Sequence, residues 1–246
     1  MTSPPPNRFL AKTFVPLQGN PWVEVSALAA KMAAEPGGVC NLGQGMTDMM
    51  APAVLRDAMK EVMSREDYKL HQYTRSAGHP RLVEALAKFY SSPLKRELDA
   101  YEEIMTSIGA DNALACCFMG FLERGDEVIV IEPSYDAYRG MVTVPGGIPV
   151  FVPLRKKEGL EDADEERCSD WVLDEEEFRS KLSDKTKMVV VNTPQNPFGK
   201  VYSEKELRFI AEIAVERDLL VINDCVYEHL VYDSQPLPRI ATLPGM

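Results

Sequence analysis

The chain has 246 residues, 45% of them hydrophobic, and a formal net charge of −11. This length allows one large core, or a core with a small appendage, and predicts a globular protein. No apolar run approaches the ~20 residues that a membrane-spanning helix needs, and the N-terminus lacks the basic-then-apolar order of a secretory signal.

The negative charge is concentrated in residues 158–177, which hold 11 acidic residues and a single basic one, Arg167. The rest of the chain is close to neutral, with 26 basic and 27 acidic residues. A local acidic run predicts a solvated surface excursion, and no basic patch suggests nucleic-acid binding. The sequence assigns no function to this segment.

Cysteine and histidine patterns argue against a metal site. The cysteines are odd in number and contain no Cys-x-x-Cys pair, and the histidines are scattered. A structural zinc site is therefore not expected, and free thiols in a reducing compartment are the simplest interpretation. The residues are Cys40, Cys116, Cys117, Cys168, Cys225, His71, His79 and His229.

Residues 1–35 are expected to form an N-terminal arm and a first helix, with Asn20-Pro-Trp22 at the junction. No acidic residue precedes Glu24, which weakly resembles an organelle transit peptide, but three prolines at positions 4–6 disfavour an amphipathic helix there. We therefore expect a cytoplasmic protein, with a mitochondrial address as the alternative. Residues 36–246 are expected to form one further domain.

From Gly78 onward, short apolar runs alternate with amphipathic stretches. The apolar runs favour buried strands of a parallel sheet, and the amphipathic stretches favour helices. The clearest helix starts with Ser203 and Glu206 in a capping box. The predicted helices cover residues 78–90, 110–122 and 203–217, and the predicted strands cover 128–131, 188–191 and 219–222. The pattern predicts an α/β fold whose mostly parallel sheet is sandwiched by helices.

Polar and aromatic side chains follow each predicted strand. Ligands of open parallel sheets lie beyond the carboxyl ends of the strands. Those ends carry Tyr135 after the first strand, Asn192 and Asn196 after the second, and Asp224 and Tyr227 after the third. Each residue alone could be an ordinary loop residue, but together they would suit a flat heteroaromatic ligand with a protonatable nitrogen.

The turn from Ser107 to Asn112 opens the helix predicted at 110–122 directly after Gly109. Free backbone N–H groups and the helix dipole make such a turn a natural phosphate site, although a glycine before a helix is often only a tight turn. No Gly-x-Gly-x-x-Gly follows a strand and no Walker-type Gly-Lys-Ser/Thr occurs, which disfavours a nucleotide-binding Rossmann domain.

Several motifs of the sequence together resemble those of a known family. The run Asn192-Thr-Pro-Gln-Asn196-Pro-Phe-Gly199, followed by Val221-Ile-Asn-Asp224-Cys-Val-Tyr227, is similar to the Asn-Pro-x-Gly and Asp-x-x-Tyr signature of class I/II aminotransferases. Four further motifs resemble the kynurenine aminotransferase and cysteine-S-conjugate β-lyase (glutamine transaminase K) group. They are Asn20-Pro-Trp22-Val-Glu, Asn41-Leu-Gly-Gln-Gly45, His71-Gln-Tyr73-Thr and Gly125-Asp-Glu-Val-Ile-Val-Ile-Glu-Pro133.

The resemblance covers about Asn20 to Met246 and implies a fold type I large domain that binds pyridoxal 5'-phosphate. Asp224 would keep the pyridine nitrogen protonated, which makes the ring an electron sink. Asn196 and Tyr227 would hydrogen-bond the ring hydroxyl, and Tyr135 would stack on the ring.

By the same resemblance, the cofactor phosphate would lie on the backbone of Ala110 and Asp111. The carboxylate of Asp111 departs from the family pattern and would repel a phosphate unless it points away. Tyr73 would reach the phosphate of a neighbouring subunit, which implies a homodimer. Gly45 and Asn196 would lie near the substrate carboxylate, and Trp22 would line the side-chain pocket.

The implied substrates are an aromatic or sulfur-containing amino acid, such as kynurenine, and a 2-oxo acid. Elimination from cysteine conjugates would be a side activity of the same carbanion. No metal is implied, and neither nucleic acid nor membrane is expected as a partner.

The chain departs from the family in one respect. The lysine that forms the Schiff base lies some tens of residues beyond Asp224 in the family, and no Ser-x-x-Lys follows Tyr227 before Met246. The small C-terminal domain of the family, with the arginine that binds the substrate carboxylate, is absent as well. The nearest lysines, at positions 185, 187, 200 and 205, are expected to be solvated surface charges.

We therefore expect an inactive chain: a fragment, an incompletely read gene or a truncated isoform. Missing strands would leave an unpaired sheet edge and exposed apolar surface, and hence marginal stability. The alternative is a non-catalytic subunit that binds and modulates a full-length partner.

Overall fold

The computed structural model describes residues 21–43, 45, 47, 49–159, 167–232 and 237–246. The chain divides into two compact units, Met1–Ser76 and Ala77–Met246. The domain boundary predicted after residue 35 stays a prediction. Within the described residues, no helix is both long enough and apolar enough to cross a bilayer.

The first unit contains α1 (Pro21–Ala33), α2 (Ala53–Ser64) and the 3-10 turn η2 (Tyr68–His71). Helix α1 lies within residues 1–35, where the sequence predicts an arm and a first helix. The predicted arm, residues 1–20, lies outside the described part of the chain.

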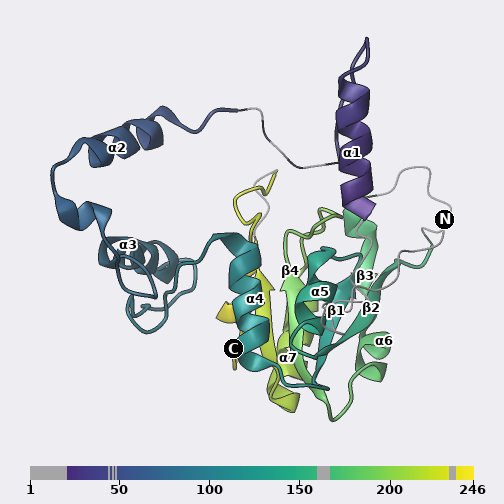
Figure 1. The fold of residues 1–246 in the computed structure, drawn as a ribbon. Coiled ribbons are helices and arrows are strands. Elements are labelled where there is room, and N and C mark those ends of the chain that lie inside the picture. Colours follow the sequence, from purple (N-terminus) through teal and green to yellow (C-terminus); the bar gives the residue numbers. More distant parts are fainter. Residues whose placement is uncertain (1–20, 44, 46, 48, 160–166, 233–236) are drawn as a thin grey trace. The chain divides into compact units, whose positions relative to one another are not determined.

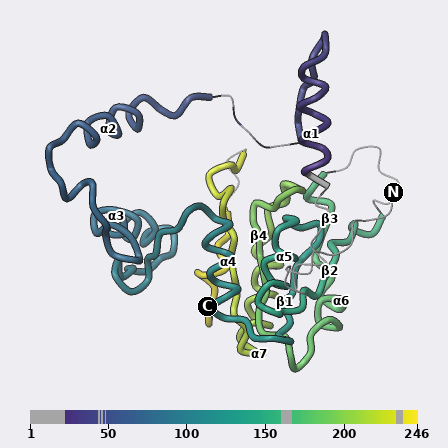
Figure 2. Tube along the Cα trace, in the orientation of Figure 1, coloured from purple at the N-terminus to yellow at the C-terminus, as the bar shows by residue number. Residues whose placement is uncertain are grey.

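The second unit is built on a five-stranded sheet in the order β3-β2-β1-β4-β5 (Figure 1, Figure 2). Strand β1 pairs in parallel with β2 and β4, and β4 pairs in parallel with β5, whereas the short β3 is antiparallel to β2. The mostly parallel sheet is confirmed, with β1, β4 and β5 as the predicted strands. The bounds are β1 (Glu127–Glu132), β2 (Ile148–Lys156), β3 (Trp171–Leu173), β4 (Thr186–Asn192) and β5 (Leu220–Asp224).

Helices cover both faces of this sheet, as predicted. Alternate residues of β1 enter two separate cores because successive strand side chains point to opposite faces. Val128 and Val130 pack with α4 and α5, whereas Ile129 and Ile131 pack with α6, α7 and η4. The helical elements of this unit are α3 (Pro80–Ser91), α4 (Gly109–Phe121), α5 (Ala137–Thr143), η3 (Cys168–Asp170), α6 (Glu175–Ser180), α7 (Glu204–Arg217) and η4 (Ile240–Thr242).

The predicted capping box starts α7. The Ser203 hydroxyl accepts the Glu206 backbone N–H at 3.3 Å, and the Glu206 carboxylate accepts the Ser203 backbone N–H at 2.9 Å. Both bonds satisfy N–H groups that a helix start leaves without partners. The helix ends at Arg217, and the left-handed conformation of the next residue, Asp218, turns the chain toward β5.

The acidic segment is only partly the surface excursion that the sequence predicts. Residues 160–166 lie outside the described part, but β3 and α6 form within the remainder. Asp174 caps α6 by accepting the Glu177 N–H at 2.8 Å, and the three glutamates that follow fill its first turn. Acidic residues stabilise a helix start because the helix dipole is positive there.

The strand order places a topological switch point between β1 and β4. After β1 the chain passes to β2 on one side, and it later returns to β4 on the other side. A crevice forms at such a point because the two connections leave in opposite directions. A ligand site is therefore expected beyond Glu132 and Asn192, where these two strands end.

Candidate active site

A small cavity of about 160 Å³ lies at the predicted place. The segments that follow β1, β4 and β5 contribute to it, together with the first turn of α4. The sequence brings these segments together because parallel strands end at one edge of the sheet. Its lining residues are Ala110, Asp111, Tyr135, Tyr138, Asn192, Asn196, Asp224, Val226 and Tyr227.

The carboxylate of Asp224, the last residue of β5, is held in a fixed position. Its Oδ2 accepts the Tyr138 hydroxyl at 2.6 Å, and its Oδ1 accepts the Val226 backbone N–H at 3.2 Å. The Asn192 amide donates to the Asp224 carbonyl at 2.9 Å. An ionised carboxylate has about four acceptor positions, so Asp224 can still accept a hydrogen bond from a ligand.

Two tyrosines form one wall of the cavity. Tyr135 and Tyr138 pack edge to face, with ring centroids 5.6 Å apart. The Tyr135 hydroxyl donates to Asp111 Oδ2 at 3.2 Å. Burial, together with the charge of Asp111, raises the pKa of Tyr135 to about 12. Burial and the hydrogen bond to Asp224 raise the pKa of Tyr138 above its ordinary value, so both tyrosines stay neutral at physiological pH.

Asn196 and Tyr227 form a second polar pair. The Asn196 amide nitrogen donates to the Tyr227 hydroxyl at 3.2 Å. The backbone N–H of Asn196 donates to Asn192 Oδ1 at 2.7 Å, which ties the loop after β4 to the strand itself. A ligand hydroxyl or oxyanion placed here would meet two groups that can both donate.

The start of α4 is shaped to receive an anion. Gly109 has a φ of +82°, a left-handed conformation that favours glycine. The residue before it, Ile108, caps the helix without any side-chain hydrogen bond. The N–H groups of the first turn at Ala110 and Asp111 therefore meet no capping side chain and lie at the positive end of the helix dipole.

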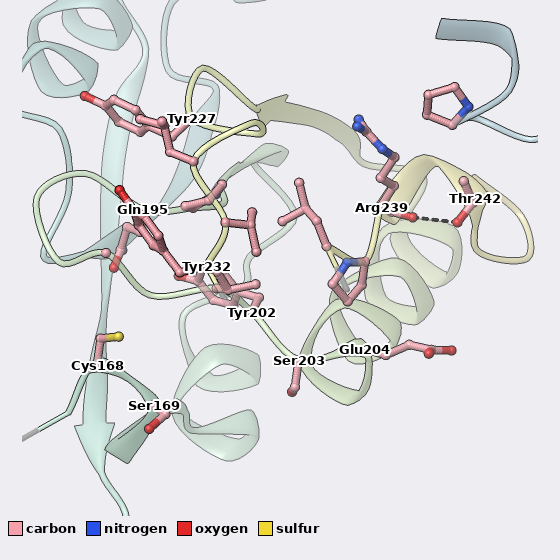
Figure 3. Close-up of a pocket in the computed structure, with 18 of the residues that line it drawn as sticks. Cys168, Ser169, Gln195, Tyr202, Ser203, Glu204, Tyr227, Tyr232, Arg239 and Thr242 are labelled. Atoms are coloured by element: carbon pink, nitrogen blue, oxygen red, sulfur yellow. Dashed lines mark hydrogen bonds between the residues drawn. The ribbon is translucent and has the colours of Figure 1, made fainter. Parts of the chain in front are cut away.

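A larger hollow of about 1340 Å³ adjoins the small cavity and shares Asn196 and Tyr227 with it. Figure 3 shows Tyr227, Gln195, Tyr232 and Tyr202 along this hollow. The Gln195 side chain donates to the Pro133 carbonyl at 2.7 Å, so it joins the loop after β4 to the loop after β1.

The structure brings six of the predicted residues together around the cavity. They are Ala110, Asp111, Tyr135, Asn196, Asp224 and Tyr227. Gly45 and Tyr73 belong to the first unit, and the Trp22 side chain lies outside the described part of the chain. Their roles stay predictions.

Sequence reasoning missed Tyr138 and Val226 as lining residues, whereas it expected Asn192 among the side chains at the strand ends but gave it no role toward the cofactor. Tyr138 lies three residues after Tyr135, within the first turn of α5, whereas Tyr135 precedes that helix.

The expectation for the lysines is wrong at one position. Lys185 and Lys205 are exposed and Lys187 is half-buried, but the side chain of Lys200 is only 4% exposed and pairs with Glu206 at 3.0 Å. Its amine also donates to the Trp171 carbonyl at 2.7 Å. The ion pair offsets the cost of burying this charge. The lining of the small cavity, among described residues, includes no lysine.

Comparison with known proteins identifies the family. The family model for aminotransferase class I and II matches residues 38–245. The chain belongs to this family. The strand-end carboxylate, the amide and phenol pair and the glycine-led helix start thus lie in a member of the class I/II aminotransferase family.

Individual relatives support the same family membership. Kynurenine–oxoglutarate transaminase 3 from Mus musculus is 43% identical over 236 residues, covering 96% of the chain and 50% of that protein. Kynurenine–oxoglutarate transaminase 1 from Homo sapiens is 40% identical, covering 92% and 52%. The solved structure of Bna3p from Saccharomyces cerevisiae has a TM-score of 0.83 at 36% identity, covering 96% and 55%. The chain therefore spans about half the length of the curated relatives it matches.

Replacing Tyr138 by Phe tests how Asp224 is held. We expect the free energy of unfolding at pH 7 to fall by about 1.5 kcal/mol, because the lost hydrogen bond is made to a charged group. Because folding raises the pKa of Tyr138, its contribution to stability is fully present below pH 10. The contribution declines above pH 10, where Tyr138 loses its proton in the unfolded chain but keeps it in the folded protein. The variant should therefore lose stability less steeply above pH 10 in urea titrations.

Tyr232→Phe is the matched control because Tyr232 is exposed. It should leave both stability and its pH dependence unchanged. An equal slope in wild type and Tyr138→Phe would contradict the assigned hydrogen bond.

Proposed function

We propose that the second unit is the cofactor-binding part of a pyridoxal-phosphate-dependent aminotransferase. The observation that carries this proposal is the Asp224 carboxylate at the floor of a cavity that also contains an aromatic ring, an amide and phenol pair, and an uncapped helix start. When bound, the cofactor supplies an electron sink through its protonated pyridine ring.

The residues of the cavity match the parts of such a ring. Asp224 would accept a hydrogen bond from the pyridinium N–H and keep that nitrogen protonated, since a nearby negative charge favours the charged form of a base. Asn196 and Tyr227 would bind the ring hydroxyl, and Tyr135 would cover one ring face. Tyr138 and Asn192 would keep Asp224 in place without contacting the ring nitrogen.

The phosphate would bind at the N–H groups of Ala110 and Asp111. The carboxylate of Asp111 accepts a hydrogen bond from the Tyr135 hydroxyl at 3.2 Å, so it has a partner within the cavity wall. The same bond would fix the tilt of the Tyr135 ring. Asp111 departs from the family pattern, and its bond to Tyr135 supports a structural role for its side chain. The backbone N–H of the same residue would bind the anion.

The proposed reaction is transfer of the amino group of kynurenine, or a similar aromatic or sulfur-containing amino acid, to a 2-oxo acid. The names of the relatives support this substrate class. Gly45, Asn196 and Trp22 would contact the substrate, and elimination from cysteine conjugates would be a side activity. We further propose a cytoplasmic homodimer in which Tyr73 reaches the partner's phosphate, with the catalytic lysine outside these 246 residues.

Titration with pyridoxamine 5'-phosphate tests cofactor binding because this form needs no lysine. Equilibrium dialysis of the 246-residue protein should give saturable binding of one molecule per chain. Pyridoxal 5'-phosphate followed by borohydride should leave no single lysine labelled stoichiometrically in mass spectra. Absence of saturable binding would refute the cofactor site, and stoichiometric labelling of one lysine would refute the proposed lack of a catalytic amine.

A further inference from the structure

A second polar cluster lies just outside the cavity and is centred on Glu228. This residue directly follows Tyr227 in the turn after β5, and its side chain is 7% exposed. Its Oε1 accepts the Tyr90 hydroxyl of α3 at 2.7 Å. Its Oε2 forms an ion pair with Arg239, at 2.5 Å from Nη2. One carboxylate thus joins the turn after β5 to α3, which lies 138 positions away in the sequence, and to the nearer segment that carries Arg239.

The charge state of this cluster is set by its contacts. Burial acts to raise the pKa of Glu228, but the hydrogen bond from Tyr90 and the positive charge of Arg239 outweigh burial and hold that pKa below its ordinary value of 4.5. The carboxylate is therefore ionised at neutral pH. The side chain of Arg239 is 17% exposed, so loss of either partner would leave the other charge poorly compensated.

Besides Glu228, three contacts attach the turn from Cys225 to Leu230: Val226 N–H donates to Asp224, the Tyr227 hydroxyl accepts from Asn196, and the His229 ring packs edge to face on Phe89. Two backbone bonds close it internally: Glu228 N–H to the Cys225 carbonyl at 2.9 Å and Leu230 N–H to the Tyr227 carbonyl at 2.8 Å. The side chains of Val226, His229 and Leu230 are exposed. A segment with little apolar burial opens easily, so a buried carboxylate at its centre has a large influence on its order.

Arg239 offers a firm anchor for this carboxylate. Its carbonyl accepts the Thr242 hydroxyl at 2.8 Å, the bond drawn as a dashed line in Figure 3. The next residue, Ile240, is buried in the core beneath α7. The guanidinium is thus carried by a segment that is packed against the body of the unit.

We propose that Glu228 is a positioning residue for the cofactor site. By binding Tyr90 and Arg239 it fixes the turn that directly follows Asp224 and contains Tyr227, and so sets where the ring-nitrogen and ring-hydroxyl partners lie. The inference rests on the proposed function and adds to it a residue outside the cavity lining. It predicts that Glu228 affects cofactor affinity without contacting the cofactor.

The test measures two quantities on the 246-residue protein and on its Glu228→Gln variant. Affinity for pyridoxamine 5'-phosphate should fall about 10-fold at a temperature where both proteins are folded. Hydrogen exchange of the amides of residues 225–230 should become faster, while amides of β1 and β4 stay protected. A purely structural role would lower the melting temperature but leave the affinity of the folded protein unchanged.

The double variant Glu228→Gln, Arg239→Gln separates stability from positioning. Removing both charges should restore much of the melting temperature, because no charge is left unpaired, while affinity stays low. Glu177→Gln is the matched control, since it breaks the Arg155–Glu177 ion pair, neither of whose residues lines the cavity, and it should leave affinity unchanged.

The positioning role of Glu228 and the proposed function can fail separately. If wild type binds and Glu228→Gln binds equally well, the positioning role is overturned and the proposed function stands. If wild type does not bind pyridoxamine 5'-phosphate, the proposed function and this inference fall together. Affinity that recovers in parallel with melting temperature in the double variant would also overturn the inference.

Discussion

Asp224→Asn should weaken the binding of pyridoxamine 5'-phosphate about 100-fold. The substitution keeps the size of the side chain and an acceptor for Tyr138 but removes the negative charge opposite the pyridinium nitrogen. A hydrogen bond to a charged group contributes about 1.5–3 kcal/mol, and 100-fold corresponds to about 2.7 kcal/mol. Equilibrium dialysis of wild type and variant at pH 7 measures the difference directly.

A cofactor analogue sharpens this experiment. In 1-deaza-pyridoxamine 5'-phosphate a carbon replaces the ring nitrogen, so the analogue should bind wild type weakly and Asp224→Asn about equally weakly. Asp126→Asn is the control, because Asp126 pairs with Lys187 and lies just before β1, at the other end of the strand from the cavity. If wild type does not prefer the natural cofactor over the analogue, Asp224 is not the partner of the ring nitrogen.

The sequence was most informative where a local rule has a direct physical cause. Strand ends of a parallel sheet share one edge, and this rule alone predicted that Tyr135, Asn192, Asn196, Asp224 and Tyr227 would lie together. The start of α7 was predicted from its capping box, because those hydrogen bonds form between residues three apart.

Contacts between distant segments were not predictable in this way. Tyr138 is bonded to a carboxylate 86 positions away, and no local pattern specifies that pairing. Strand β2 was missed because Pro149 and Pro153 interrupt its apolar pattern. The structure accommodates them where β2 has only β1 as a strand partner, since β3 pairs with residues 154–156 alone.

The error at Lys200 has the same origin. A lysine between a glycine and a valine gives no sign that it is buried, and its partner Glu206 already had a local role in the capping box. The structure adds a second role, because Glu206 Oε1 also accepts the Leu173 N–H of β3 at 3.2 Å. The pair therefore joins the edge of the sheet to the start of α7.

Lys200→Met should lower the free energy of unfolding by about 3–5 kcal/mol, the cost of breaking a buried ion pair and leaving one charge behind. The Glu206 side chain is only 11% exposed, so water cannot easily replace the lost amine. Hydrogen bonds from Ser203 and the charge of Lys200 overcome burial and hold the pKa of Glu206 below 4.5. Without the amine, that carboxylate should protonate more readily. Urea unfolding at pH 7 measures the loss.

Two further variants separate the ion pair from the packing. Lys205→Met removes an exposed lysine from its pair with Glu175 and should change stability by less than about 1 kcal/mol. Lys200→Met combined with Glu206→Gln should recover part of the loss, because no buried charge remains and Gln still accepts hydrogen bonds. A Lys200→Met variant as stable as wild type would contradict the stabilising role of the buried Lys200–Glu206 pair.

The same substitution connects the fold to the site. Lys200 closes the loop that carries Asn196, since its carbonyl accepts the Gln195 N–H at 2.9 Å and the Gly199 N–H donates to the Gln195 carbonyl at 2.8 Å. Release of the Lys200 amine from Trp171 and Glu206 should loosen this loop before the sheet unfolds. Hydrogen exchange at residues 195–200 should therefore rise more than exchange in β4, whereas Lys205→Met should change neither.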